Sequence, residues 1–306
     1  MFCSAFPKIY FYKMTLLILL FLFSCNEDSP VRKTIHGISL FNQESKIALT
    51  LPKKLKELSG LALTPDGRLF GHNDESADIF QIDYSNGSII KSFSVGEKKL
   101  KKDFEGIAIV NDLFYLVTSN GEIYEFKEGE DKSTVPYEKY KTTLTSKNNV
   151  EGLCYDYMTE SLLLACKDYP GKNYNGKRAI YSFSLINKKL KKNPRFLISI
   201  EEVKRLMESN VAQKLGDFFL LTEDGFAPSG IEVHPQRKSF FVLSSHGRTI
   251  IEINSEGEIM GILLLDKKHH NQPEGITFTR ELSLLIGDEG ESGKAKITNY
   301  PATLNN

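Results

Sequence analysis

Short runs of aliphatic, aromatic and β-branched residues, separated by polar turns, recur along most of this chain. The stretch EGIAIVNDLFYLVTSNGEIYEFK (105–127) predicts three short strands with Asn-Asp and Asn-Gly turns between them, and PYEKYKTTL (136–144) predicts a weaker fourth. Pro-Asp-Gly and Asn-Gly turns divide residues 61–95 in the same way. The pattern therefore predicts an all-β chain of antiparallel strands.

Five of the apolar runs open with an acidic or hydroxyl residue followed by glycine: ELSGLALT, DFEGIAIV, NVEGLCYD, APSGIEVH and QPEGITFT. The shared glycines are Gly60, Gly106, Gly152, Gly230 and Gly275, at spacings of 46, 46, 78 and 45 residues. Four short strands in each such period are typical of a β-propeller blade. The long interval indicates an insertion of roughly 32 residues, well above the usual loop length.

We therefore expect one β-propeller domain over residues 37–306 with five blades, or six if another blade lies in the long interval. The last repeat runs out after three strands, whereas residues 37–51 form an unassigned strand or pair, so the N-terminal strand is expected to close the last blade. Between the third and fourth repeats, about residues 199–226 predict an inserted helix and loop. Ser199 would be its N-cap, and Ile200, Val203, Leu206 and Met207 have helical spacing.

The N-terminus reads as a targeting segment rather than part of the fold. Lys8 and Lys13 precede the apolar run MTLLILLFLFSC, which is short for a membrane span and ends at Cys25. LFSC resembles the lipobox of bacterial lipoproteins, which implies a signal peptide over 1–24, a lipidated Cys25 and a polar tether over 25–36. An uncleaved signal anchor is the rival interpretation.

Composition narrows the class of partner. The chain has 306 residues, of which 41% are hydrophobic and 25% charged, with 39 Lys and Arg against 39 Asp and Glu. This composition is typical of a globular protein. The chain has no excess of basic residues that would favour binding to nucleic acid. Cys154 and Cys166 lie in apolar runs and are expected to be small buried hydrophobes, with a disulfide as the alternative. No zinc motif occurs, since the pair His269 and His270 lacks partners at ligand spacing.

The repeat predicts where chemistry would gather. In a propeller the first strand of each blade lines the central channel, and the loop that leads into it lies on the same face as the loop between the second and third strands. We therefore expect a ring of acidic and polar side chains at one channel mouth. Its metal-ligand candidates are Glu105, Glu151, Glu274, Asp288 and Glu289, and its further binding candidates are Ser59, Asp74, Glu75, Asp168, Ser229 and His246.

So many carboxylates near one axis need protonation, a basic partner such as Lys167 or Arg248, or a bound cation. Ca²⁺ is the expected cofactor, because oxygen donors suit a hard ion. The alternative is that each Glu caps backbone N–H groups where blades meet, a structural role that repetition in every blade would also produce. His72 and His246 could act as a base at this mouth, but no nucleophile motif accompanies them, so no catalytic residue is assigned.

The phrases quoted above, together with SSHGRTIIEI and SLLIGDEG, resemble the SdiA-regulated family, the YjiK-like exported β-propellers, from about residue 55 to 300. The resemblance implies a propeller in the cell envelope, with a central cation as an option, and implies no assigned reaction. Its glycine phrases also occur in phytase-like and NHL-type propellers.

Two functional hypotheses follow. The first is a membrane-anchored lipoprotein that binds a small ligand or a protein at its acidic channel mouth. The second is a metal-dependent hydrolase of phosphoesters or lactones, although the scarcity of basic residues disfavours a phytate-like substrate. We expect a monomer at the outer membrane or cell surface, since Glu27 and Asp28 after Cys25 resemble the surface-export signal of Bacteroidota lipoproteins; a solvated linker explains them equally well.

Overall fold

The computed structural model describes residues 36–98, 100–211, 225–291 and 293–303, together with Met1. The chain separates into two units, residues 1–34 and 35–306, and apart from Met1 all the described residues belong to the second. The proposed signal peptide, Cys25 and most of the tether lie outside the described residues. Within the described residues, no helix is long and apolar enough to cross a membrane.

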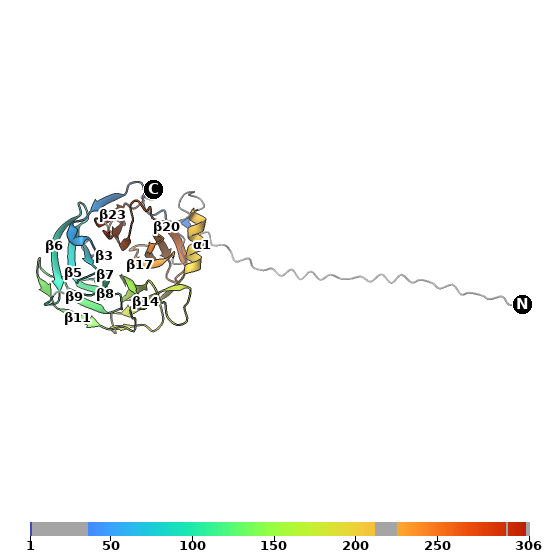
Figure 1. Cartoon of the computed structure of the whole chain (residues 1–306), viewed down its shortest axis with the longest axis horizontal. Helices are drawn as coiled ribbons and strands as arrows, with labels where there is room; N and C mark the ends of the chain where they lie inside the picture. The colour runs from blue at the N-terminus through green and yellow to red at the C-terminus, as the bar shows by residue number, and fades with distance from the viewer. Residues whose placement is uncertain (2–35, 99, 212–224, 292, 304–306) are drawn as a thin grey trace. The chain divides into compact units, whose positions relative to one another are not determined.

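Five β-sheets form the blades of a propeller, which confirms the predicted fold and blade number (Figure 1). Blade 1 contains β3 (Leu58–Leu63), β4 (Leu69–Asn73), β5 (Asp78–Asp83), β6 (Ser88–Val95) and β10 (Thr134–Val135). Blade 2 contains β7 (Phe104–Val110), β8 (Leu113–Thr118), β9 (Ile123–Lys127) and β11 (Tyr137–Tyr140). Blade 3 contains β12 (Val150–Asp156), β13 (Ser161–Cys166), β14 (Lys177–Ser184), β15 (Lys189–Leu190) and β16 (Phe196–Ser199).

Blades 4 and 5 complete the ring with strands from both ends of the domain. Blade 4 contains β17 (Ala227–Val233), β18 (Phe240–His246), β19 (Thr249–Ile253), β20 (Ile259–Leu264) and β1 (His36–Gly37). Blade 5 contains β21 (Pro273–Phe278), β22 (Leu284–Asp288), β23 (Lys296–Tyr300) and β2 (Ile47–Thr50). The antiparallel pairing of β2 with β23 is the predicted N-terminal closure. The parallel pairings of β1 with β20 and of β10 with β6 were not predicted.

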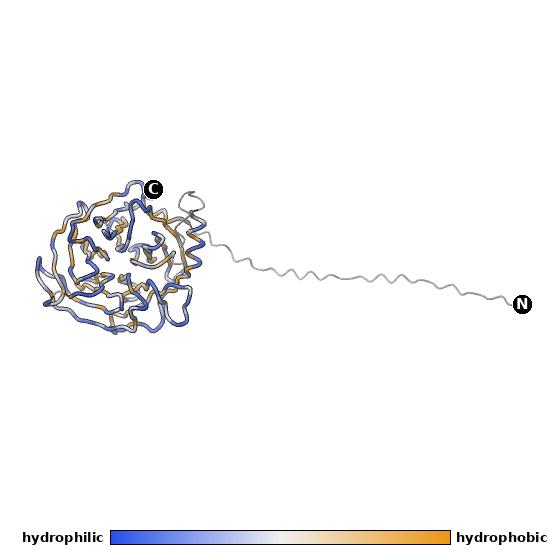
Figure 2. Tube along the Cα trace, viewed as in Figure 1, coloured by the Kyte–Doolittle hydropathy of each residue, from blue (hydrophilic) through white to orange (hydrophobic). Residues whose placement is uncertain are grey.

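The core consists of five hydrophobic clusters, one between each pair of adjacent blades. The apolar stretches in Figure 2 follow the strands that carry these clusters. Cys154 and Cys166 are buried in two of them as free thiols, as expected of small hydrophobes. Because every blade packs on both neighbours, the five innermost strands are fixed around one axis.

The insertion after blade 3 contains the predicted helix, α1 (Ile200–Val211), at the outer rim of the propeller. Val203 and Met207 are buried in the cluster between blades 3 and 4, and Leu206 packs against it. The backbone N–H of Glu202 donates to Ser199 Oγ at 3.2 Å, so Ser199 is the N-cap. Residues 212–224 of the insertion lie outside the described residues.

Replacement of Ser199 by Ala should lower the free energy of unfolding by about 1 kcal/mol, because one N–H of the first helical turn loses its acceptor. Ser209→Ala in the same helix is the matched control. The Ser209 side chain is exposed and donates only to the Leu206 carbonyl, so its loss should be nearly neutral. Urea denaturation of both variants measures the difference, and equal effects would contradict the capping role.

Candidate functional site

The five innermost strands each begin with a β-bulge at the residue before the shared glycine. The pairing of the first strand with the second skips one residue in every blade, and the skipped residues are Ser59, Glu105, Glu151, Ser229 and Glu274. A bulged residue has no pairing partner on the adjacent strand, and the bulge can change the direction of its side chain. The repeated phrase of the sequence therefore marks five bulges, and their side chains line the central channel.

The glycine after each bulge permits the blades to converge. A Cβ on Gly230 would lie 2.6 Å from the backbone oxygen of Glu274, and one on Gly106 would lie 2.8 Å from the backbone nitrogen of Leu153. The channel at this level has a volume of about 10 Å³, enough for about one water molecule. The glycines therefore allow neighbouring strands to approach closely at the axis, and the channel is almost closed at its middle.

Glu105 and Glu274 are desolvated carboxyl groups at this end of the channel. Burial, with added repulsion from Glu151, Asp103 and Glu274, raises the pKa of Glu105 to about 9. Burial also raises the pKa of Glu274 to about 8. The hydrogen bond of 2.8 Å from Gln272 Nε2 to Glu274 Oε1 opposes this shift, because it stabilises the ionised form. Both groups therefore retain a proton near neutral pH.

Glu151 differs because it has a basic partner. Lys167 Nζ donates to Glu151 Oε1 at 3.0 Å, and the Glu151 side chain is only 8% exposed. Burial raises the pKa of Glu151, and the lysine opposes this shift. Lys167 is thus the basic partner that the sequence suggested, whereas the Arg248 guanidinium donates to the His270 carbonyl at 2.9 Å.

Loops extend the carboxylate set outward from the channel. Burial and a hydrogen bond to Glu57 raise the pKa of Glu289 to about 7, and Gln272 Nε2 also donates to Glu289. Burial raises the pKa of Asp74, with contributions from Glu57 and Asp103. These side chains form one electrostatic group, which we call the acidic mouth: Glu57, Asp74, Asp103, Glu105, Glu151, Glu274 and Glu289.

The remaining predicted residues lie in different surroundings. Ser229 is buried, and its hydroxyl donates to the Pro273 carbonyl at 2.8 Å. Ser59 Oγ donates to Glu105 Oε2 at 3.4 Å. Asp168 follows Lys167 and raises the pKa of Glu151 through its charge. Glu75 and His246 are exposed.

Asp288 belongs to a separate buried chain of side chains. Its Oδ2 lies 2.8 Å from His270 Nδ1, and His270 Nε2 lies 2.6 Å from the Tyr300 hydroxyl. All three residues are at most 3% exposed. The Asp288 side chain therefore contacts His270, which in turn contacts Tyr300, although Glu289 is its neighbour in the chain.

Within the described part of the chain, no three His, Cys, Asp or Glu side chains are arranged so that they could hold a metal ion. A Ca²⁺ ion at the acidic mouth would need its side chains to move toward it. The calcium site therefore stays a prediction, and the acidic mouth is the part of the predicted set to which it applies.

Sequence reasoning missed several members of this site. Glu57, Asp103 and Gln272 each lie two residues before a bulged residue, at equivalent positions of the repeat. Aligning the five copies two residues further upstream would have found them. His72 was considered as a base at this mouth or as an exposed loop residue without function, but it is fully buried, and its Nε2 has no hydrogen-bond partner. Burial lowers the pKa of His72 to about 4, so it is neutral between blades 1 and 2.

Comparisons with known proteins agree with this architecture. The family model described as SdiA-regulated matches residues 38–291. No curated protein matches the chain. A solved luciferin-regenerating enzyme has a TM-score of 0.52 at 9% identity, covering 85% of this chain and 96% of that one. A glutaminyl cyclase from Myxococcus xanthus has a TM-score of 0.49 at 10% identity over the same shares of each chain. At these identities the likeness concerns the fold alone.

Proposed function

Since the chain belongs to the SdiA-regulated family, we propose that it is a membrane-anchored lipoprotein whose propeller binds a cation-bearing ligand or partner at the acidic mouth. The observation that carries the proposal is the excess of desolvated carboxyl groups there. Glu105, Glu274 and Glu289 have pKa values raised to about 9, 8 and 7, whereas Lys167 pairs with Glu151. A bound cation would offset this repulsion and stabilise the ionised carboxylates.

Ca²⁺ is the cation to test first. Because Glu105 and Glu274 retain protons near pH 7, binding should displace protons into the solvent. Calorimetric titration of the chain with Ca²⁺ should therefore give heats that differ between two buffers of unequal ionisation enthalpy. Glu105→Gln should weaken binding by about tenfold or more, as expected when a group next to a metal loses its charge.

Glu128→Gln is the matched control for this titration. Glu128 forms ion pairs with Arg68 and Lys91 and follows β9 of blade 2 outside the acidic mouth, so its loss should leave Ca²⁺ affinity unchanged. A flat titration and an unchanged melting temperature in millimolar Ca²⁺ would refute cation binding and favour the structural role of the acids. Turnover of a phosphoester or lactone that depends on Ca²⁺ would instead favour the metal-dependent hydrolase.

The anchor is tested separately at Cys25. The LFSC sequence, the basic residues before it and the polar stretch after it support lipidation of this cysteine. Labelled palmitate should enter the chain in a bacterial host and be lost in Cys25→Ala, and fractionation with protease shaving should place the anchored form at the cell surface. Without acyl chains on residue 25 the variant should leave the membrane fraction, and an unlabelled variant that stays there would favour the uncleaved signal anchor. Label retained by Cys25→Ala would contradict the assignment.

A further inference from the structure

A pocket of about 470 Å³ opens at the other ends of the five innermost strands, away from the acidic mouth. All five strands line it, through Leu63, Ile109, Tyr155, Val233 and Phe278. Its volume lies in the range of about 300 to 1,000 Å³ that is usual for small-molecule sites. The propeller thus has a second concave surface on its axis, and the acidic mouth contributes no residue to it.

One blade departs from the repeat inside this pocket. Two residues after the shared glycine, the five copies carry Ala62, Ala108, Cys154, Glu232 and Thr277, and all five line the pocket. Four of these side chains are small and carry no carboxylate. Because a structural requirement of the repeat would act on every blade, a single Glu among small residues indicates a role specific to blade 4.

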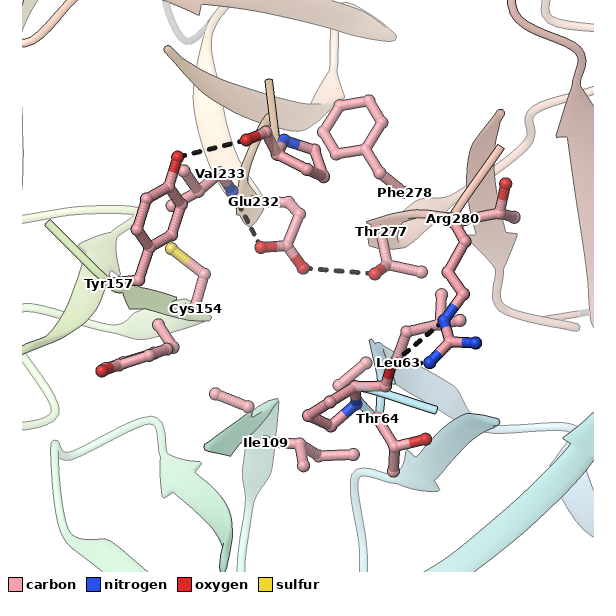
Figure 3. A pocket seen from close by; sticks show the side chains of 16 residues that line it. Leu63, Thr64, Ile109, Cys154, Tyr157, Glu232, Val233, Thr277, Phe278 and Arg280 are labelled. Atoms are coloured by element: carbon pink, nitrogen blue, oxygen red, sulfur yellow. Dashed lines mark hydrogen bonds between the residues drawn. The ribbon is translucent and has the colours of Figure 1, made fainter. Parts of the chain in front are cut away.

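Figure 3 shows the Glu232 carboxylate inside the pocket between Cys154 and Thr277. The backbone N–H of Val233 donates to its Oε1 at 2.8 Å, and Thr277 Oγ1 donates to its Oε2 at 3.2 Å. These two bonds orient the group, yet neither donor carries a charge. Burial raises the pKa of Glu232 to about 7, against both hydrogen bonds.

The walls around this carboxylate are largely apolar. Ile109, Val233 and Phe278 contribute hydrophobic surface. The Tyr157 hydroxyl donates to the Pro235 carbonyl at 3.2 Å, which holds the ring beside the pocket. Arg280 Nε donates to the Pro65 carbonyl at 3.0 Å, so the guanidinium is tied to the turn of blade 1 at an exposed position.

An apolar pocket with one carboxylate suits a ligand with an apolar body and one cationic hydrogen-bond donor. Hydrogen bonds to an ionised partner are roughly twice as strong as neutral ones, and an ammonium group would supply the missing charge. We propose that this pocket binds a small apolar amine, whose ammonium group donates to Glu232 and whose apolar part contacts the walls formed by the five strands.

Three probes of similar size separate the contribution of the charged group from that of the apolar body. They are 2-phenylethylamine, 2-phenylethanol and phenylacetate, each titrated into the chain by calorimetry. The amine should bind saturably and about tenfold or more tightly than the alcohol. Glu232→Gln should remove this preference and change alcohol binding by less than about threefold. Leu63→Trp, which replaces an aliphatic side chain of the pocket with a larger indole ring, should weaken binding of the amine and of the alcohol alike.

Glu125→Gln is the matched control, since it removes a largely buried Glu from β9 of blade 2, outside both this pocket and the acidic mouth. It should leave amine affinity unchanged. Melting temperatures establish that each variant folds, and amide NMR shifts at Val233 and Thr277 locate the bound amine without any substitution. Equal binding of amine and alcohol, a preference for phenylacetate, or no saturable binding of the amine would overturn the proposal.

Discussion

Alanine at Gly230 is expected to lower the free energy of unfolding by about 3 kcal/mol, the upper part of the usual range for overpacking. The added Cβ would lie 2.6 Å from the backbone oxygen of Glu274 and 3.1 Å from the side chain of Ile276. Both neighbours belong to the innermost strand of the next blade. Relief would require two blades to separate at the axis, where every blade is held on both sides.

Gly293→Ala provides the comparison for this prediction. The nearest atom to a Cβ there is the Gly290 oxygen at 3.6 Å, an ordinary van der Waals contact. Its effect should stay within about 0.5 kcal/mol. Urea denaturation of both variants at one pH gives the two values, and a loss at Gly230 no larger than that at Gly293 would show that the glycine is not required by close packing.

Glu105→Gln should make the stability of the protein less sensitive to pH between pH 6.5 and 8.5. The pKa of Glu105 rises from 4.5 to about 9 on folding, mainly through burial. Below pH 4.5 the carboxyl group is protonated in both the folded and the unfolded state, so it does not change the pH dependence of stability. Above it the unfolded chain releases the proton that the folded chain keeps, so stability falls as the pH rises toward 9.

The expected loss over these two pH units is about 3 kcal/mol for this group, at about 1.4 kcal/mol per unit. Urea denaturation at pH 6.5 and 8.5 should show a loss that is smaller by about this amount in Glu105→Gln than in the parent chain, while Glu274, with its pKa raised to about 8, contributes to the loss in both proteins. This window lies above the range in which neutral, buried His72 contributes, because its pKa falls from 6.5 to about 4. Parallel pH profiles for the two proteins would contradict the assignment of a raised pKa to Glu105.

The propeller could be predicted from the sequence because the same close contact of a glycine with the neighbouring blade recurs at all five blade interfaces. Gly60, Gly106, Gly152, Gly230 and Gly275 meet a neighbouring blade in the same way, so their spacing reports the fold directly. The closure by β2 followed from counting strands. The parallel pairing of β1 with β20 could not be predicted by counting strands, because it adds a two-residue strand to a blade that already contained four strands.

The site was less accessible to prediction because its properties depend on contacts between repeats. The shared phrase identified Glu105, Glu151 and Glu274. Only the tertiary structure shows that Lys167 pairs with Glu151, and that Glu105 has no basic partner of its own among the described residues. Asp288 was grouped with them by loop position, whereas its contact is with His270, eighteen residues earlier. Glu232 departs from the repeat, so a search for shared residues passes over it.

The pairing of β2 with β23 determines when the ring can be completed during synthesis. Residues 47–50 are synthesised long before their partners, residues 296–300. The hairpins of the other blades can form as they emerge, since their main pairings are local. Until residues 296–300 have been made, β2 lacks the strand with which it pairs in the folded protein, and this earlier segment stays available to chaperones.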